Sequence, residues 1–228
     1  MTDVAVTTSA DSFSRWADWL TAAGLEPVAL PCIEVVPASE DELDRARRAA
    51  GEADAILLTS PRPVGLLWPD GGMPAVPVAA VGPATAAAVE DAGGITELVG
   101  DAGGDELLAE WQNVDGRRIV FPHARGADLG RLETLESRGA HVERFPVYEA
   151  RPTPPGPDPV DSALFASPSA VEGWLISRSL NELRVVGVIG ATTAEAIRQA
   201  GGIADAMADE PTAEAVVEAL LAALERKP

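Results

Sequence analysis

The sequence predicts an α/β protein made of two doubly wound, parallel-sheet lobes that derive from an internal repeat. Three observations lead to this prediction. Short apolar runs alternate with helical stretches, the chain repeats itself, and 46% of its 228 residues are hydrophobic. Strands that alternate with helices form βαβ units, and such units build parallel sheets. The hydrophobic fraction is high enough for a buried core and argues against disorder.

The repeat is clearest at two Ser-Pro motifs and two motifs that contain Gly and Thr. The matching segments are 60–64 with 167–171, 78–86 with 186–194, and, more faintly, 30–34 with 145–149. Internal similarity of this kind indicates a duplicated structural unit. We interpret the chain as two copies, at about residues 1–115 and 116–228, and hence as two lobes.

Both copies have the same order of expected elements. In the first copy we expect strands at 4–7, 27–36, 55–59 and 78–81 and helices at 12–23, 84–92 and 107–111. In the second copy we expect strands at 119–121, 141–150, 163–166 and 185–189 and helices at 128–138, 192–200 and 213–224. The short apolar runs are typical of buried strands. Glycines such as Gly24 and Gly139 follow the helical stretches, as glycine commonly does after a helix end. Five prolines within residues 151–161 indicate a linker.

Charge and composition exclude several classes of protein. The chain has 17 basic and 36 acidic residues and a net charge of −19, which disfavours binding to nucleic acid or to an anionic membrane surface. No apolar run is long enough to span a membrane, and the first residues do not resemble a secretory signal, so we expect a cytoplasmic protein. Cys32 is the only cysteine and there are two histidines, so we expect neither a disulfide nor a metal site.

Hydroxyl residues follow the expected strands in both copies. Ser60 and Ser167 each precede a proline, whereas Thr85 and Thr193 each lie three residues after a glycine. Ligands of doubly wound proteins bind at the carboxyl ends of strands, where the N–H groups of helix starts attract anions. Helix capping is an equally good explanation for each serine alone, because Ser before Pro is a preferred start of a helix. Taken together, four such helix starts would line one cleft and hold a polyanion.

Other residues give weaker indications. Tyr148 is the only tyrosine, and its phenol donates a hydrogen bond while neutral, although a purely structural role stays open. His123 stands at a strand end, where we expect a surface position. Trp16 and Trp19 are expected to pack in a core or against the other lobe. The sequence contains no dinucleotide-binding glycine motif, no P-loop and no nucleophile elbow.

An ordered set of motifs resembles one family, uroporphyrinogen-III synthase. The motifs are LTSPR at 58–62, VGPATA at 81–86, FPVYE at 145–149, FASPSAV at 165–171, IGATTA at 189–194 and EPT at 210–212. The resemblance implies that the lobes exchange segments relative to the repeat. Residues 1–32 and 152–228 would form one lobe and residues 37–146 the other. Residues 33–36 and 147–151 would be the strands of a two-stranded linker.

The resemblance also implies the reaction and its residues. Hydroxymethylbilane, a linear tetrapyrrole with eight carboxylates, would lose water and close to uroporphyrinogen III with ring D inverted. No metal or cofactor is implied. Tyr148 would be catalytic, and the substrate-binding residues would be Ser60, Arg62, Thr85, Ser167 and Thr193.

We expect a monomer that makes transient contact with the upstream deaminase, because the substrate is unstable. The alternative is a non-catalytic regulatory module of the same two-lobed fold that binds a tetrapyrrole or another anion.

Overall fold

The computed structural model describes residues 2–100, 104–210 and 212–227, and the chain divides into two compact units. Met1–Val35 and Ala150–Pro228 form one unit, called here the terminal unit. Val36–Glu149 forms the other, the central unit. The divisions at 35/36 and 149/150 fall inside the two segments expected to link the lobes.

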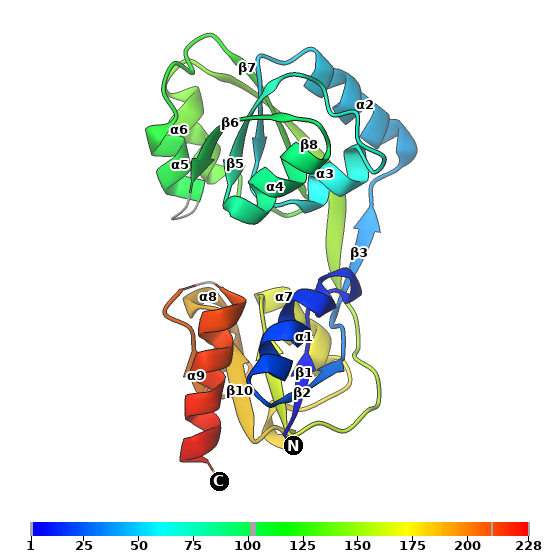
Figure 1. The fold of residues 1–228 in the computed structure, drawn as a ribbon, viewed down its shortest axis with the longest axis vertical. Coiled ribbons are helices and arrows are strands. Elements are labelled where there is room, and N and C mark those ends of the chain that lie inside the picture. The colour runs from blue at the N-terminus through cyan, green and yellow to red at the C-terminus, as the bar shows by residue number, and fades with distance from the viewer. Residues whose placement is uncertain (1, 101–103, 211, 228) are drawn as a thin grey trace. The chain divides into compact units, whose positions relative to one another are not determined.

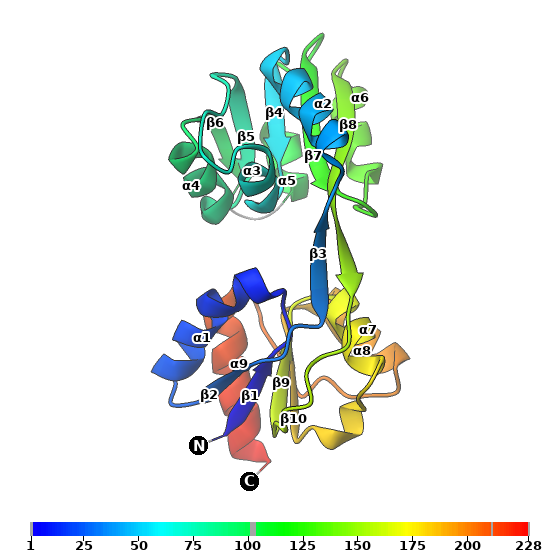
Figure 2. The same ribbon diagram turned by 90° about the vertical axis from the view of Figure 1, so that its right-hand side faces the viewer.

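The terminal unit contains a five-stranded parallel sheet with the order β11-β10-β9-β1-β2. Its strands are β1 (Asp3–Val6), β2 (Glu26–Ala29), β9 (Ser162–Phe165), β10 (Val185–Val188) and β11 (Ala206–Met207). Its helices are α1 (Phe13–Ala22), α7 (Pro168–Leu175), α8 (Ala191–Gln199) and α9 (Ala213–Arg226). In Figure 2, α1 and α9 lie on one side of this sheet and α7 and α8 on the other.

Alternating side chains of β1 explain why both faces of this sheet are covered. Val4 and Val6 pack into a cluster with Leu20 of α1 and Leu220 of α9. Ala5, between them, belongs to a second cluster that includes residues of α7 and α8. Successive strand residues point to opposite faces, so a strand that is apolar throughout requires helices on both sides.

Gly173 allows α7 to approach the linker closely. A Cβ at this position would lie 2.1 Å from the carbonyl oxygen of Cys32 and 2.8 Å from that of Thr153. Both oxygens are backbone atoms, so no side-chain movement would relieve the clash. Trp174, the next residue, is completely buried in the same cluster.

The central unit contains a six-stranded sheet with the order β3-β8-β7-β4-β5-β6. Its strands are β3 (Ile33–Pro37), β4 (Ala55–Leu58), β5 (Pro77–Val81), β6 (Ile95–Gly100), β7 (Arg118–Ala124) and β8 (His141–Pro152). Its helices are α2 (Glu40–Gly51), α3 (Arg62–Leu67), α4 (Pro83–Asp91), α5 (Gly104–Glu110) and α6 (Glu133–Glu136). One face of the sheet is closed by a cluster that joins Leu57 and Phe121 to Leu107 of α5 and Leu135 of α6.

The strand orders show the repeat directly. The two sheets have equivalent strand orders, β6-β5-β4-β7-β8 and β11-β10-β9-β1-β2. At each position of these two orders, the two strands are counterparts from the two copies of the sequence. The first two strands of each copy therefore belong to the unit that holds the later strands of the other copy. β3 and β8 are neighbouring strands and carry the chain between the units, as Figure 1 shows.

Some expected elements differ in the structure. The single strand expected at 27–36 is two strands, β2 and β3, interrupted at Pro31, which has no N–H to donate. The helices expected at 12–23 and 128–138 each begin as a 3-10 turn, Ala10–Ser12 and Gly130–Leu132. β6 and β11 were not expected. No helix in the described ranges is long and apolar enough to cross a membrane.

Candidate functional site

The residues expected to bind substrate lie at the carboxyl edges of the two sheets, divided between the units. In the central unit, Ser60 follows β4 and Thr85 follows β5, whereas Tyr148 lies on β8 opposite Ala124, the last residue of β7. In the terminal unit, Ser167 follows β9 and Thr193 follows β10. Parallel strands that share an edge place their following loops together, and in this fold class that edge binds ligands.

The two Ser-Pro motifs have different local structures. Ser167 is the N-cap of α7, and its hydroxyl accepts a hydrogen bond of 3.2 Å from the Ala170 N–H. Capping by Ser60 does not occur, so that interpretation is wrong for this residue. α3 begins one residue later, with Pro61 as its N-cap, because Pro61 already has helical angles and its carbonyl accepts from Val64. Helix capping therefore explains Ser167 but leaves Ser60 for another role.

The two glycine-threonine motifs form matching helix starts. Gly82 and Gly190 are the N-caps of α4 and α8, and a Cβ at either would meet no atom within 4 Å. The open space beside them leaves the backbone accessible. Gly82 has a φ of +79°, a conformation that other residues rarely adopt. Thr85 and Thr193 are only 2% exposed, and their N–H groups already bond to the carbonyls of Gly82 and Gly190. These motifs therefore offer a ligand the earlier first-turn N–H groups, such as that of Ala84, more than hydroxyl groups.

Arg62 and Tyr148 are brought into contact within the central unit. The guanidinium carbon of Arg62 lies 5.5 Å from the centroid of the Tyr148 ring, a cation–π arrangement. Tyr148 is 9% exposed, and its carbonyl oxygen accepts a hydrogen bond of 2.6 Å from the Arg125 N–H. Sequence reasoning selected both residues but gave no sign that they touch.

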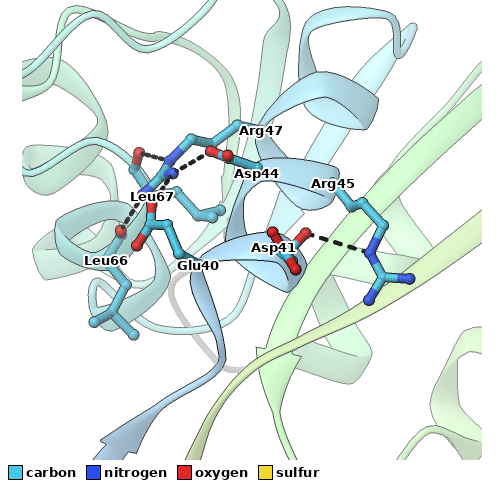
Figure 3. Close-up of polar contacts among 7 residues, drawn as sticks. All are labelled: Glu40, Asp41, Asp44, Arg45, Arg47, Leu66 and Leu67. Atoms are coloured by element: carbon cyan, nitrogen blue, oxygen red, sulfur yellow. Dashed lines mark hydrogen bonds and ion pairs between the residues drawn. The ribbon is translucent and has the colours of Figure 1, made fainter.

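Arg47 supports the helix that carries Arg62. Its Nε donates to the Leu67 carbonyl at 2.8 Å and its Nη2 to the Leu66 carbonyl at 3.3 Å, while Glu40 and Asp44 accept from Nη1 (Figure 3). The last carbonyls of a helix have no partners inside it, so an arginine from α2 satisfies the end of α3. The sequence of α2, in which acidic residues precede arginines, gives no signal for this function.

His123 is buried, contrary to the expected surface position. It is 7% exposed and stacks on Phe121 with ring centroids 5.1 Å apart. A carbonyl oxygen only accepts, so Nδ1 carries the proton and donates to Ala124 at 2.8 Å. Burial lowers the pKa of His123, the Ala124 bond opposes this, and Arg144 and Arg125 lower it further. The alternation of β7 turns the side chain inward.

A pocket beside the start of α9 does not fit an anionic ligand. It has a volume of about 450 Å³ and is lined by four acidic side chains, Asp209, Glu210, Glu214 and Glu218. Such a lining repels carboxylates. No cluster of three or more metal-binding side chains occurs among the residues that the structure describes.

Comparisons with known proteins agree on one family. Residues 14–218 match the family model described as "Uroporphyrinogen-III synthase HemD". A uroporphyrinogen-III synthase of Synechococcus elongatus is 30% identical over 65% of this chain and 60% of its own length. A porphyrin biosynthesis protein HemD of Ruminiclostridium josui is 27% identical over 96% of this chain and 48% of its own. This chain thus spans less than two thirds of either curated relative.

Solved structures share the fold. The uroporphyrinogen-III synthetase of Helicobacter pylori superposes with a TM-score of 0.67 at 19% identity, covering 97% of this chain and 99% of that one. A mutant uroporphyrinogen III synthase of Thermus thermophilus gives 0.64 at 20% identity, covering 99% and 100%.

Proposed function

The chain belongs to the uroporphyrinogen-III synthase family, and on this premise we propose that it cyclises hydroxymethylbilane to uroporphyrinogen III. The substrate loses the hydroxyl of its terminal hydroxymethyl group as water. Ring D is inverted as the macrocycle closes. The observation that carries this proposal is a family match from residue 14 to residue 218, which takes in sheet edges from both units.

Each unit offers a helix start that suits a carboxylate bound by backbone groups. The first turns of α4 and α8 begin at accessible glycines, and helix starts attract carboxylates without any lysine. We assign substrate binding to Thr85 and Thr193 at these two first turns. We assign the same role to Ser60 and Ser167 at the starts of α3 and α7. The serine hydroxyl groups add donors of their own.

Tyr148 is the proposed catalytic residue. Its phenol O–H donates a hydrogen bond to the departing hydroxyl group. The phenol passes its proton to the hydroxyl oxygen as the carbon–oxygen bond breaks, so that water leaves. The tyrosinate takes back the proton that ring D releases when the macrocycle closes. Binding that holds the two ends of the substrate close together favours ring closure with inversion over spontaneous closure to the symmetric isomer I.

The test supplies freshly generated hydroxymethylbilane to the purified chain, oxidises the products and separates the porphyrin isomers. We expect isomer III. If only isomer I forms at high protein concentration, the proposal is wrong. Tight binding of a tetrapyrrole without isomer III would instead support a non-catalytic binding module.

The Tyr148→Phe variant tests the role of the phenol. It should form isomer III about a hundredfold more slowly, the lower end of the usual contribution of a proton donor. Circular dichroism and the urea midpoint should show a folded protein. A rate equal to that of the wild type would remove Tyr148 from the mechanism.

A further inference from the structure

The contact between Arg62 and Tyr148 joins two residues from separate elements. Arg62 is the first residue of α3, and Tyr148 lies on β8. The guanidinium carbon is 5.5 Å from the ring centroid. A cation over an aromatic face is attracted by the negative potential of that face, most strongly where water is excluded. Tyr148 is 91% buried, so the contact lies in such a place.

The backbone around Arg62 is restrained at both ends of α3. Pro61 and Pro63 flank Arg62, and each proline ring fixes its own φ angle. At the other end, Arg47 donates to the carbonyls of Leu66 and Leu67 (Figure 3). The helix is six residues long and would be marginal by itself. These restraints give the Arg62 side chain a defined starting point.

The backbone that carries the Tyr148 ring is held in the sheet. Its neighbour Val147 is fully buried, and its own carbonyl is bonded to the Arg125 N–H at 2.6 Å. A tyrosine side chain has two free torsions once its backbone is fixed. The Arg62 contact restricts both of them, because it exists only while the ring face is turned toward α3.

We propose that Arg62 is a positioning residue that orients the Tyr148 phenol for the departure of the hydroxyl group. This inference rests on the proposed function. It differs from the role that the family resemblance implies for Arg62, which is contact with the substrate. A positioning role predicts a change in kcat, whereas a substrate contact predicts a change in KM.

The first experiment detects the contact without any enzyme assay. Because Tyr148 is the only tyrosine, protein labelled with ¹³C-tyrosine gives the NMR signals of this one ring. Arg62→Met should shift the ring resonances and broaden them as the ring gains freedom. The matched control is Arg117→Met, which removes an arginine 5.7 Å from the Trp111 ring in the same unit and should leave the Tyr148 signals unchanged. Unchanged Tyr148 signals in Arg62→Met would overturn the inference.

The second experiment measures isomer III formation. Arg62→Met should lower kcat about tenfold, or ~1.4 kcal/mol, with KM within about twofold of the wild type. Arg62→Lys keeps the cation and should recover part of the loss. Arg62→Met combined with Tyr148→Phe should be no slower than Tyr148→Phe alone, because the two residues act as one unit.

The outcomes separate the two proposals. A raised KM with normal kcat would make Arg62 a substrate ligand and overturn the positioning role, as would additive losses in the double variant. A wild-type chain that yields only isomer I would refute the proposed function itself. An active wild type with unchanged kcat in Arg62→Met would refute the inference alone.

Discussion

At the scale of single residues, His123 links burial to the pH dependence of stability. Its ring is 93% buried, and Nε2 has no hydrogen-bond partner within the described residues. Protonation of Nε2 would place a charge inside the central unit. The folded state therefore prefers the neutral ring, and burial lowers its pKa below that of the unfolded chain.

We expect stability to fall as acid protonates this histidine. Between the lowered native pKa and the unfolded value of about 6.5, the unfolded chain binds more protons, so the free energy of unfolding rises with pH. The stabilisation is present above about pH 6.5 and is lost as pH falls through the native pKa. Urea titrations between about pH 7.5 and 5.5 measure this slope.

The variant His123→Phe should have a smaller slope, because it keeps an aromatic ring beside Phe121 without a titrating group. His141→Asn, on the exposed start of β8, is the control and should retain the slope contributed by His123. If His123→Phe and the wild type lose stability equally in acid, the ring is not buried in solution.

At the scale of elements, the short helix α3 depends on a donor from α2. Arg47→Met removes the hydrogen bonds to the carbonyls of Leu66 and Leu67 and leaves them without these charged donors. We expect a loss of about 1–2 kcal/mol in the free energy of unfolding. The matched variant Arg45→Met removes a bond to Asp41 within the same helix and should cost less than about 0.5 kcal/mol. Equal urea midpoints for the two variants would contradict this assignment.

The elements that sequence predicts best are those whose pattern is local. β4, β9 and β10 are buried at every position, so their apolar runs were unambiguous. β6 has exposed residues at alternate positions on a sheet edge and no continuous apolar run. Capping by Ser60, one of two equally good explanations of the Ser-Pro motif, does not occur, because the carbonyl of Pro61 accepts the first bond of α3.

In the candidate site, too, features that depend on local sequence were predicted and features that depend on packing were not. The hydroxyl and glycine motifs were predicted because each precedes a helix in an ordered repeat. Two features could not be predicted: the contact of Arg62 with Tyr148, and the hydrogen bonds from Arg47 to the end of α3. Each depends on how separate elements pack. A sequence motif contains no information about such distances.

At the scale of the whole molecule, the net charge of −19 bears on the encounter with the proposed substrate, which carries eight carboxylates. In the proposed site, local N–H groups bind the substrate, so we expect the repulsion to act mainly during approach. Salt shortens the range of this repulsion to about 10 Å at 0.1 M. We expect kcat/KM to rise about twofold between low and moderate salt, with kcat unchanged. A steep fall with KCl, absent with sucrose, would instead indicate a basic binding surface.

The central unit is built from one segment of the chain and the terminal unit from two. This difference predicts how fragments of the chain fold. The central unit is one continuous segment that contains β4 to β8 and its own core cluster. The terminal unit is assembled from both ends, and β1 lies between β2 and β9. A fragment of residues 150–228 lacks β1 and α1, so β9 loses its neighbour and Leu164 loses the packing of Trp16 and Leu20.

We therefore expect the fragment 36–149 to fold alone, with a cooperative urea transition and dispersed amide resonances, because its core needs no other segment. The fragment 150–228 should remain largely unfolded, since a parallel sheet without β1, β2 and α1 cannot bury enough apolar surface. Adding a peptide of residues 1–35 should restore its structure through β1, which supplies Val4 and Val6 to one face and Ala5 to the other. Independent folding of 150–228, or failure of 36–149 to fold, would show that the units do not have separate cores.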